Sequence, residues 1–159
     1  GLADCWSYIY LYAERTDAAR RQSDAASLRA VELDPESAQA QASRAWSLSL
    51  SGRQDEAVAA FEAAIRLDPN LFEPHYFYAR LCFVRGRLEK AIELYERAML
   101  IRPEDHQAPL LVAQIYDDLG RPSDAAASRT RGILIAEEHL KLNPDDARAL
   151  YMQITRIHG

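Results

Sequence analysis

Cysteine is scarce in this sequence, and its scarcity argues against a disulfide-stabilised secreted domain. The 159 residues contain two cysteines, Cys5 and Cys82. They fall in helical segments two sequence repeats apart, and stacked repeats hold such positions well beyond the Cα separation of about 7 Å that a disulfide allows. Both have apolar neighbours, so we expect buried free thiols and a reducing compartment, the cytoplasm.

An excess of basic residues is also missing. The chain has 19 basic and 24 acidic residues and a net charge of -5. A surface that binds nucleic-acid phosphates needs a basic stripe, so we expect no nucleic-acid partner, including the single-stranded RNA that some helical repeats read. No apolar run approaches the roughly 20 residues of a membrane span, and the first residues are not a signal peptide. We therefore expect no membrane insertion.

Motifs that carry chemistry are absent as well. The sequence has no glycine-rich phosphate loop, nucleophile elbow or metal motif. Its histidines follow no ligand spacing, although His75 and His106 would approach each other if neighbouring repeats stack. Adjacent acids such as Asp117 and Asp118 point about 100° apart on a helix, which does not suit a catalytic pair. We predict that the chain is not an enzyme, and that it holds no cofactor and no metal.

What the sequence does contain is a period of 34 residues. Prolines and glycines recur at this step: Pro35, Pro69 and Pro103, and Gly52, Gly86 and Gly120. Between a glycine and the next proline, apolar residues such as Ala57, Phe61 and Ala64 are spaced i, i+4 and i+7, which is one face of a helix. A glycine ends the preceding helix in the left-handed conformation, and the proline stops the following one. Each period is therefore a helix, a tight turn and a helix.

This pattern predicts an all-α repeat protein with about four repeats in one domain, residues 1–159. The repeats span about 1–36, 37–70, 71–104 and 105–145, followed by a terminal helix at 146–158. The fourth repeat has an extended second helix, because Pro144 comes seven residues later than the period requires. We expect nine helices at residues 2–14, 17–33, 37–51, 54–67, 71–85, 88–101, 105–119, 122–142 and 146–158.

The four repeats resemble tetratricopeptide repeats. The resemblance rests on recurring slots: a small residue in the first helix, the glycine, an alanine, an aromatic and a second alanine in the second helix, and the closing proline. Small residues at the crossing let paired helices approach closely, and we expect the aromatics to fill the core. These slots hold Ala45, Ala79 and Ala113; Ala57, Ala91 and Ala125; Phe61 and Tyr95; and Ala64 and Ala98. The resemblance implies a right-handed α-solenoid.

Some slots depart from the pattern. In the fourth repeat, Arg129 stands in the aromatic slot and Gly132 in the second alanine slot. Arg44 occupies a slot of the second repeat that is usually apolar. We expect its aliphatic stem to lie on the core while its guanidinium reaches water.

The resemblance also implies a binding surface, because the first helices of tetratricopeptide arrays line a concave groove. Their second, fifth, ninth and twelfth slots face this groove, and the final helix adds to it. Exposed aromatics beside an arginine are typical anchors of a binding hot spot. We therefore expect a peptide or partner protein to bind there, with Arg80 pairing a carboxylate. The predicted groove residues are Trp46, Tyr76, Arg80, Phe83, Gln114, Asp117 and Tyr151. In the alternative, the aromatics pack between adjacent repeats.

Two further points concern partners. The carboxylate clamp of chaperone-binding repeats needs Lys and Asn at the fifth and ninth slots. This chain has Ala42 and Trp46 at these slots of the second repeat, and Tyr76 and Arg80 in the third. The clamp is therefore absent, and we expect no chaperone tail as the partner. Short phrases near both ends resemble repeat arrays of bacterial signalling proteins, such as cyclases, kinases and winged-helix regulators. The alternative function is thus a regulatory segment of a larger signalling enzyme or transcription regulator, which acts in cis or through a homodimer. The last helix either caps the array or continues it.

Overall fold

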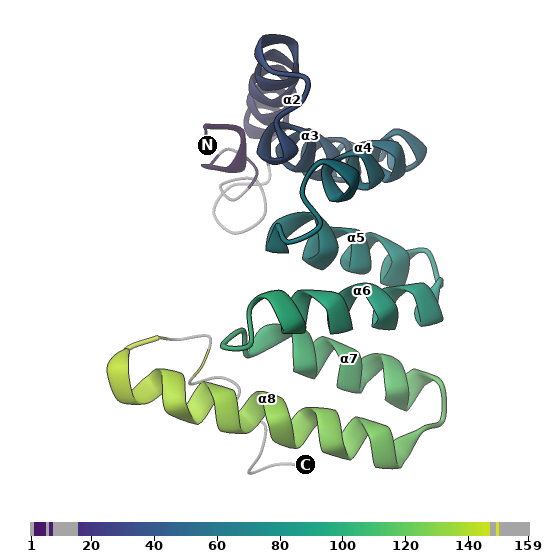
Figure 1. Cartoon of the computed structure of the whole chain (residues 1–159), viewed down its shortest axis with the longest axis vertical. Coiled ribbons are helices and arrows are strands. Elements are labelled where there is room, and N and C mark those ends of the chain that lie inside the picture. Colours follow the sequence, from purple (N-terminus) through teal and green to yellow (C-terminus); the bar gives the residue numbers. More distant parts are fainter. Residues whose placement is uncertain (1, 6, 8–15, 147–148, 150–159) are drawn as a thin grey trace. The chain divides into compact units, whose positions relative to one another are not determined.

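The computed structural model describes residues 2–5, 7, 16–146 and 149 (Figure 1). The chain divides into two compact units, residues 1–81 and 82–159. The division falls within one helix, α5. The single domain predicted from the sequence stays a prediction.

The first unit contains α2 (Asp17–Leu33), α3 (Ala38–Leu50), α4 (Gln54–Leu67) and most of α5 (Phe72–Val84). Residues 2–5 and 7, at the start of the chain, are helical as well. Helix α3 packs against both α2 and α4. The hydroxyls of Thr16 and Ser37 cap α2 and α3 by accepting hydrogen bonds from the amides of Ala19 and Ala40, which satisfies backbone donors that a helix start leaves free.

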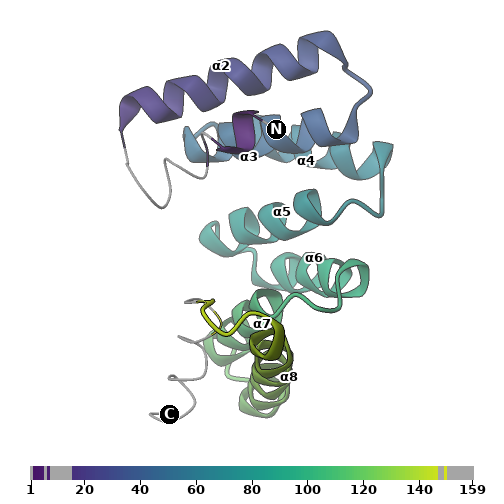
Figure 2. The ribbon, with the colours of Figure 1, turned by 90° about the vertical axis from the view of Figure 1, so that its left-hand side faces the viewer.

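The second unit contains α6 (Leu88–Ile101), α7 (Gln107–Asp118) and α8 (Pro122–Leu142). Helix α7 packs against both α6 and α8 (Figure 2). The predicted bounds of α2, α4, α6 and α8 are confirmed at both ends, and those of α3, α5 and α7 within two residues. The extended second helix that the sequence predicts for the fourth repeat is the 21-residue α8. The predicted terminal helix lies almost entirely outside the described residues.

The three inter-helix glycines adopt the left-handed conformation that their period predicts. Gly52, Gly86 and Gly120 have φ values of 77°, 69° and 68°. After each glycine, the next amide returns to a carbonyl five residues earlier, as when the Arg87 amide donates to the Cys82 carbonyl at 2.8 Å. This closure of a helix end favours glycine because a Cβ is strained at positive φ. The turn chemistry thus explains why glycine marks the period.

The recurring small and aromatic slots form the core. The alanines at these slots are at most 1 % exposed, and the rings of Phe61 and Tyr95 are fully buried. Phe61 also stacks on Tyr78, with ring centres 5.5 Å apart. Small side chains at the helix crossings and large ones between them produce close packing. The predicted core is confirmed for these residues.

Gly132 has a packing role of its own. It lies in α8 where this helix meets α7, and a Cβ there would lie 2.7 Å from Cγ of Leu110 and 3.2 Å from the carbonyl oxygen of His106. The close approach of the two helices therefore explains why glycine stands in an alanine slot.

We expect Gly132→Ala to lower the free energy of unfolding by about 1 kcal/mol, because overpacking costs about 1–3 kcal/mol and exceeds the roughly 1 kcal/mol that alanine adds to a helix. Urea unfolding followed by circular dichroism measures the change. The exposed Ala126→Gly in α8 is the control, since it changes helix propensity alone. A more stable Gly132→Ala protein would show that α7 moves aside at no cost.

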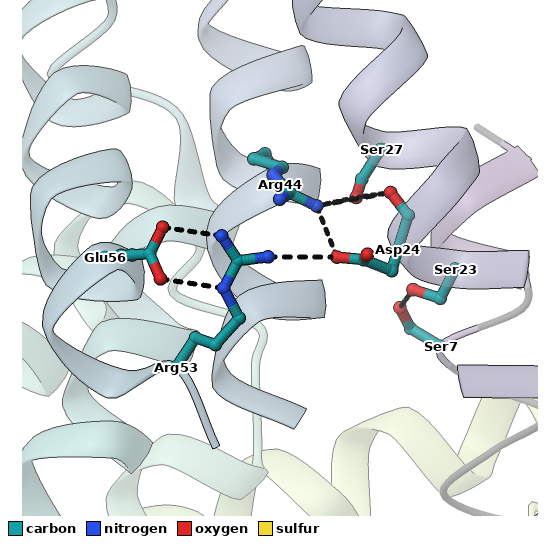
Figure 3. A network of polar contacts seen from close by, with 7 residues as sticks. All are labelled: Ser7, Ser23, Asp24, Ser27, Arg44, Arg53 and Glu56. Carbon is teal, nitrogen blue, oxygen red and sulfur yellow. Dashed lines mark hydrogen bonds and ion pairs between the residues drawn. The ribbon is translucent and has the colours of Figure 1, made fainter. Parts of the chain in front are cut away.

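Two expectations on single residues are wrong. Cys82 is buried as expected, but Cys5 is exposed. The guanidinium of Arg44 does not reach water: the side chain is only 11 % exposed, and Nη1 lies 2.6 Å from Oδ1 of Asp24 on α2. Figure 3 shows this contact, together with hydrogen bonds from Arg44 to the Asp24 carbonyl and to the Ser27 hydroxyl, both at 3.2 Å. Polar partners on α2, rather than water, thus satisfy this charge.

Neighbouring polar contacts extend this network. The carboxylate of Asp24 also lies 3.7 Å from Arg53, which pairs with Glu56 through two hydrogen bonds (Figure 3). The hydroxyls of Ser7 and Ser23 lie 2.7 Å apart. Polar contacts therefore join α2 to Arg44 of α3, to Arg53 at the start of α4 and to Ser7 before it.

Candidate protein-binding surfaces

The first unit gathers four of its aromatic and basic side chains on α3 and α5. Trp46 lies on α3, while Tyr76, Phe77 and Arg80 lie within one turn and a half of α5. The rings of Trp46 and Phe77 stack with their centres 4.2 Å apart, and Tyr76 meets Phe77 edge-on at 5.3 Å. Stacked and edge-to-face pairs of this kind are favourable beyond the area that they bury. We call these four residues the aromatic–arginine cluster.

Arg80 lies over the ring of the tryptophan. Its guanidinium carbon lies 5.7 Å from the centre of the Trp46 ring, within the range of a cation–π contact. Among the described residues, no carboxylate or carbonyl bonds this guanidinium. The hydrogen-bond donors of Arg80 are therefore available to a carboxylate from outside the unit.

The exposure expected of the aromatics is not found. Trp46 and Tyr76 are only 8 % and 7 % exposed. Both rings contact Phe77, and Tyr76 also stacks on Phe72 with ring centres 5.3 Å apart. Phe77 itself and Arg80 are partly exposed. Sequence reasoning missed Phe77, although its place one residue after Tyr76 on a helix that also carries Arg80 marks it as a neighbour of both. The parts of the cluster that solvent reaches therefore belong mainly to Arg80 and Phe77.

The other predicted groove residues lie in the second unit or beyond the described chain. Phe83 is partly exposed near the end of α5, and Gln114 is exposed on α7. Asp117 is engaged by Arg129 of α8 at 2.6 Å. Tyr151 lies outside the described residues. Within the first unit, the structure brings Trp46, Tyr76 and Arg80 together.

The second unit has a cleft that the sequence did not reveal. It lies between α6, α7 and α8 and measures about 480 Å³. Its lining residues are Glu96, Met99, Leu100, Val112, Tyr116, Asp124, Ala127, Ser128 and Arg131. Val112 lies two positions, or about 200°, from Gln114 around α7. The cleft therefore opens on the side of α7 that faces away from the predicted groove residue.

Electrostatic shifts in the second unit have simple causes. Burial raises the pKa of the Tyr116 hydroxyl, and the nearby Glu96 carboxylate raises it further. Arg121 lies over the Tyr116 ring, 4.6 Å from its centre. Burial also raises the pKa of the Cys82 thiol, which keeps this thiol protonated and unreactive at neutral pH. Neither group is therefore prepared for acid–base or nucleophilic chemistry.

Histidines and acidic residues do not assemble a metal site in the described part of the chain. His75 bonds the carbonyl of Pro69, and His106 packs beside His139, with ring centres 5.2 Å apart. His139 in turn contacts the Asp146 carboxylate at 2.9 Å. Across residues 2–5, 7, 16–146 and 149, no group of three potential ligands is close enough to hold an ion. In the same residues, every helix is too short or too polar to cross a bilayer.

Comparison with known proteins agrees with this architecture. Two tetratricopeptide repeat models match the sequence, one at residues 6–72 and the other at residues 48–115. No curated protein sequence matches the chain.

Solved structures of MamA share the fold. Two have TM-scores of 0.73 and 0.70, both at 20 % identity, and cover 88 % and 87 % of this chain and 79 % and 75 % of their own. A third, MamA MSR-1 C2, has a TM-score of 0.65 at 16 % identity and covers 84 % of this chain and 74 % of its own. The helix pairs, the positive-φ glycines, the alanine and aromatic core and the two overlapping matches lead to one conclusion: the chain belongs to the tetratricopeptide repeat family.

Proposed function

We propose that this scaffold binds a peptide or partner protein through the aromatic–arginine cluster of its first unit, and that Arg80 pairs with a carboxylate of that partner. Tetratricopeptide arrays are protein-interaction scaffolds in general and are typically not enzymes. The observation that carries the proposal is the position of Arg80, which lies on the Trp46 ring with its hydrogen-bond donors unused by the described residues.

The geometry favours a carboxylate over other polar groups. A guanidinium presents a planar fork of N–H donors that matches two carboxylate oxygens. The contact with the Trp46 ring restricts the Arg80 side chain before a partner binds, so less rotamer freedom is lost on binding. The partly exposed Phe77 ring beside it provides an apolar contact for a neighbouring side chain of the partner. The predicted ligand is therefore an acidic residue next to an apolar one.

We expect peptides selected from a random display library on the whole chain to contain Asp or Glu beside an apolar residue. Their affinity should fall about tenfold or more in Arg80→Ala, because a hydrogen bond to a charged group is worth about 1.5–3 kcal/mol. Arg80→Lys should recover only part of the loss, since lysine keeps the charge and lacks the fork. Titration calorimetry of each variant with one selected peptide measures these changes.

The control for this experiment is Arg66→Ala, which removes an exposed arginine from α4, a helix that carries no residue of the cluster. It should leave the affinity unchanged. Substitution of Trp46 or Tyr76 is less informative, because both are buried and their loss would disturb folding. If every selected peptide bound Arg80→Ala as tightly as the original chain, the proposal would be wrong.

A further inference from the structure

The contact between α2 and α3 uses polar side chains at slots where the next repeat packs aromatic rings. Phe61 of α4 stacks on Tyr78 of α5, with ring centres 5.5 Å apart. One period earlier, Ser27 of α2 stands in the slot of Phe61, and Arg44 of α3 stands in the slot of Tyr78. Arg44 donates a hydrogen bond of 3.2 Å to the Ser27 hydroxyl. A polar contact therefore replaces an aromatic one at this interface.

Helix α2 also buries little apolar surface. Its buried side chains are those of Ala19, Ser23 and Ser27, whereas α4 buries the whole ring of Phe61. The two leucines of α2 are 45 % and 68 % exposed. The apolar burial that holds helices together is therefore smaller for α2 than for α4.

The Asp24 carboxylate supplies charged contacts for this interface. Asp24 stands where α4 has Val58. Its Oδ1 lies 2.6 Å from Arg44 and 3.7 Å from Arg53. The Asp24 side chain is 39 % exposed, and contacts between charges that water reaches are weakened by solvent and by salt. The attachment of α2 to α3 thus depends on partly exposed polar contacts, while that of α4 depends on a buried ring.

We propose that α2 opens from the first unit while α3 and α4 stay folded together, and that the Asp24 carboxylate holds α2 closed. Parts of one protein open locally with different free energies, and each helix pair of a repeat array is stabilised only by its neighbours. Helix α3 keeps its contact with α4 when α2 leaves. Opening would expose the Arg44 guanidinium, whose side chain is 11 % exposed in the closed structure. The segment would therefore control access to a second arginine on the helix that carries Trp46.

Hydrogen exchange of the whole chain under native conditions, measured by mass spectrometry on fragments from α2 and α4, tests this proposal. A 17-residue helix such as α2 is only marginally stable by itself, so its amides exchange once it has left α3. After correction for intrinsic rates, the slowest amides of α2 should exchange at least about tenfold faster than those of α4. Their exchange should also depend less on added urea, because local opening exposes less surface than global unfolding.

Two variants separate local opening from global unfolding. Phe61→Leu weakens a contact that the opened state keeps, so it should speed exchange in α4 by about tenfold and leave α2 unchanged. Asp24→Ala should speed exchange in α2 by about tenfold or more, because it removes a hydrogen bond to a charged group. The control is Glu32→Ala, which breaks an exposed pair with Arg29 on α2 and should change exchange by at most about twofold.

The comparison of α2 with α4 in the original chain needs no variant, so it decides the question even if Asp24→Ala does not fold. Equal exchange in the two helices, together with equal acceleration of both by Phe61→Leu, would show that α2 unfolds only with the rest of the unit and would overturn the proposal. An effect of Asp24→Ala no larger than that of Glu32→Ala would overturn the role of the carboxylate. No peptide is used, so the outcome does not depend on the site at Arg80.

Discussion

Phe61→Ala should lower the free energy of unfolding by about 3–5 kcal/mol, the usual cost of removing a buried aromatic side chain. The Phe61 ring is fully buried and stacks on Tyr78 within the first unit. Stability in a repeat array is approximately the sum of the repeats and of the interfaces between neighbours, and this ring contributes to the core of a repeat. Urea unfolding monitored by circular dichroism measures the loss.

The fourth repeat supplies a matched control for this substitution. Arg129 stands in the same slot, but its side chain is 47 % exposed and pairs with Asp117 at the surface. Arg129→Ala should change the free energy of unfolding by at most about 1 kcal/mol, because exposed ion pairs contribute little. Similar losses for Phe61→Ala and Arg129→Ala would show that the aromatic slot is not the packing centre that its burial indicates.

Much of the fold could be predicted because the period specifies both helix ends. Each glycine provides the left-handed residue of a turn, and each proline prevents the helix from continuing. The slots between them are constrained by helix packing, so an alanine or an aromatic there has one place to go. The late proline at Pro144 predicted the length of α8 for the same reason. The larger signalling protein suggested by the short terminal phrases stays a prediction.

The candidate surfaces were predicted less well, because exposure depends on neighbours that the slot pattern does not include. Trp46 and Tyr76 occupy groove slots but are buried, and both contact Phe77, which lies outside those slots. The cleft of the second unit was missed because a slot pattern records which residues match and not the space that remains between the helices.

Arg44 was also misplaced, although the sequence held a sign of its partner. Ser23, Asp24 and Ser27 place polar groups on adjoining faces of α2, a helix whose later counterparts carry alanines and an aromatic at their core slots. A basic residue in an apolar slot of the next helix is then best satisfied by that polar surface. Pairing across two helices, 20 residues apart, cannot be seen from the 34-residue period alone.

Asp24→Ala should therefore be the second large loss, about 1.5–3 kcal/mol, which is the range for a lost hydrogen bond to a charged group. It leaves the Arg44 guanidinium, whose side chain is 11 % exposed, without a carboxylate. Arg44→Leu should cost less, because Asp24 is 39 % exposed and keeps Arg53 at 3.7 Å. The exposed Glu32→Ala, which breaks a surface pair with Arg29 on the same helix, is the control and should cost under about 1 kcal/mol.

The double variant Asp24→Ala, Arg44→Leu separates the cost of an unpaired buried charge from the value of the pair. Replacing a whole buried ion pair with apolar residues is often neutral, whereas removing one partner is costly. The double variant should therefore be more stable than Asp24→Ala alone when both are unfolded in urea. If it were less stable, the two losses would simply add, and Arg44 would not depend on Asp24 for its burial. The rescue follows from the network, because Arg44 has one carboxylate partner there while Asp24 has two arginines.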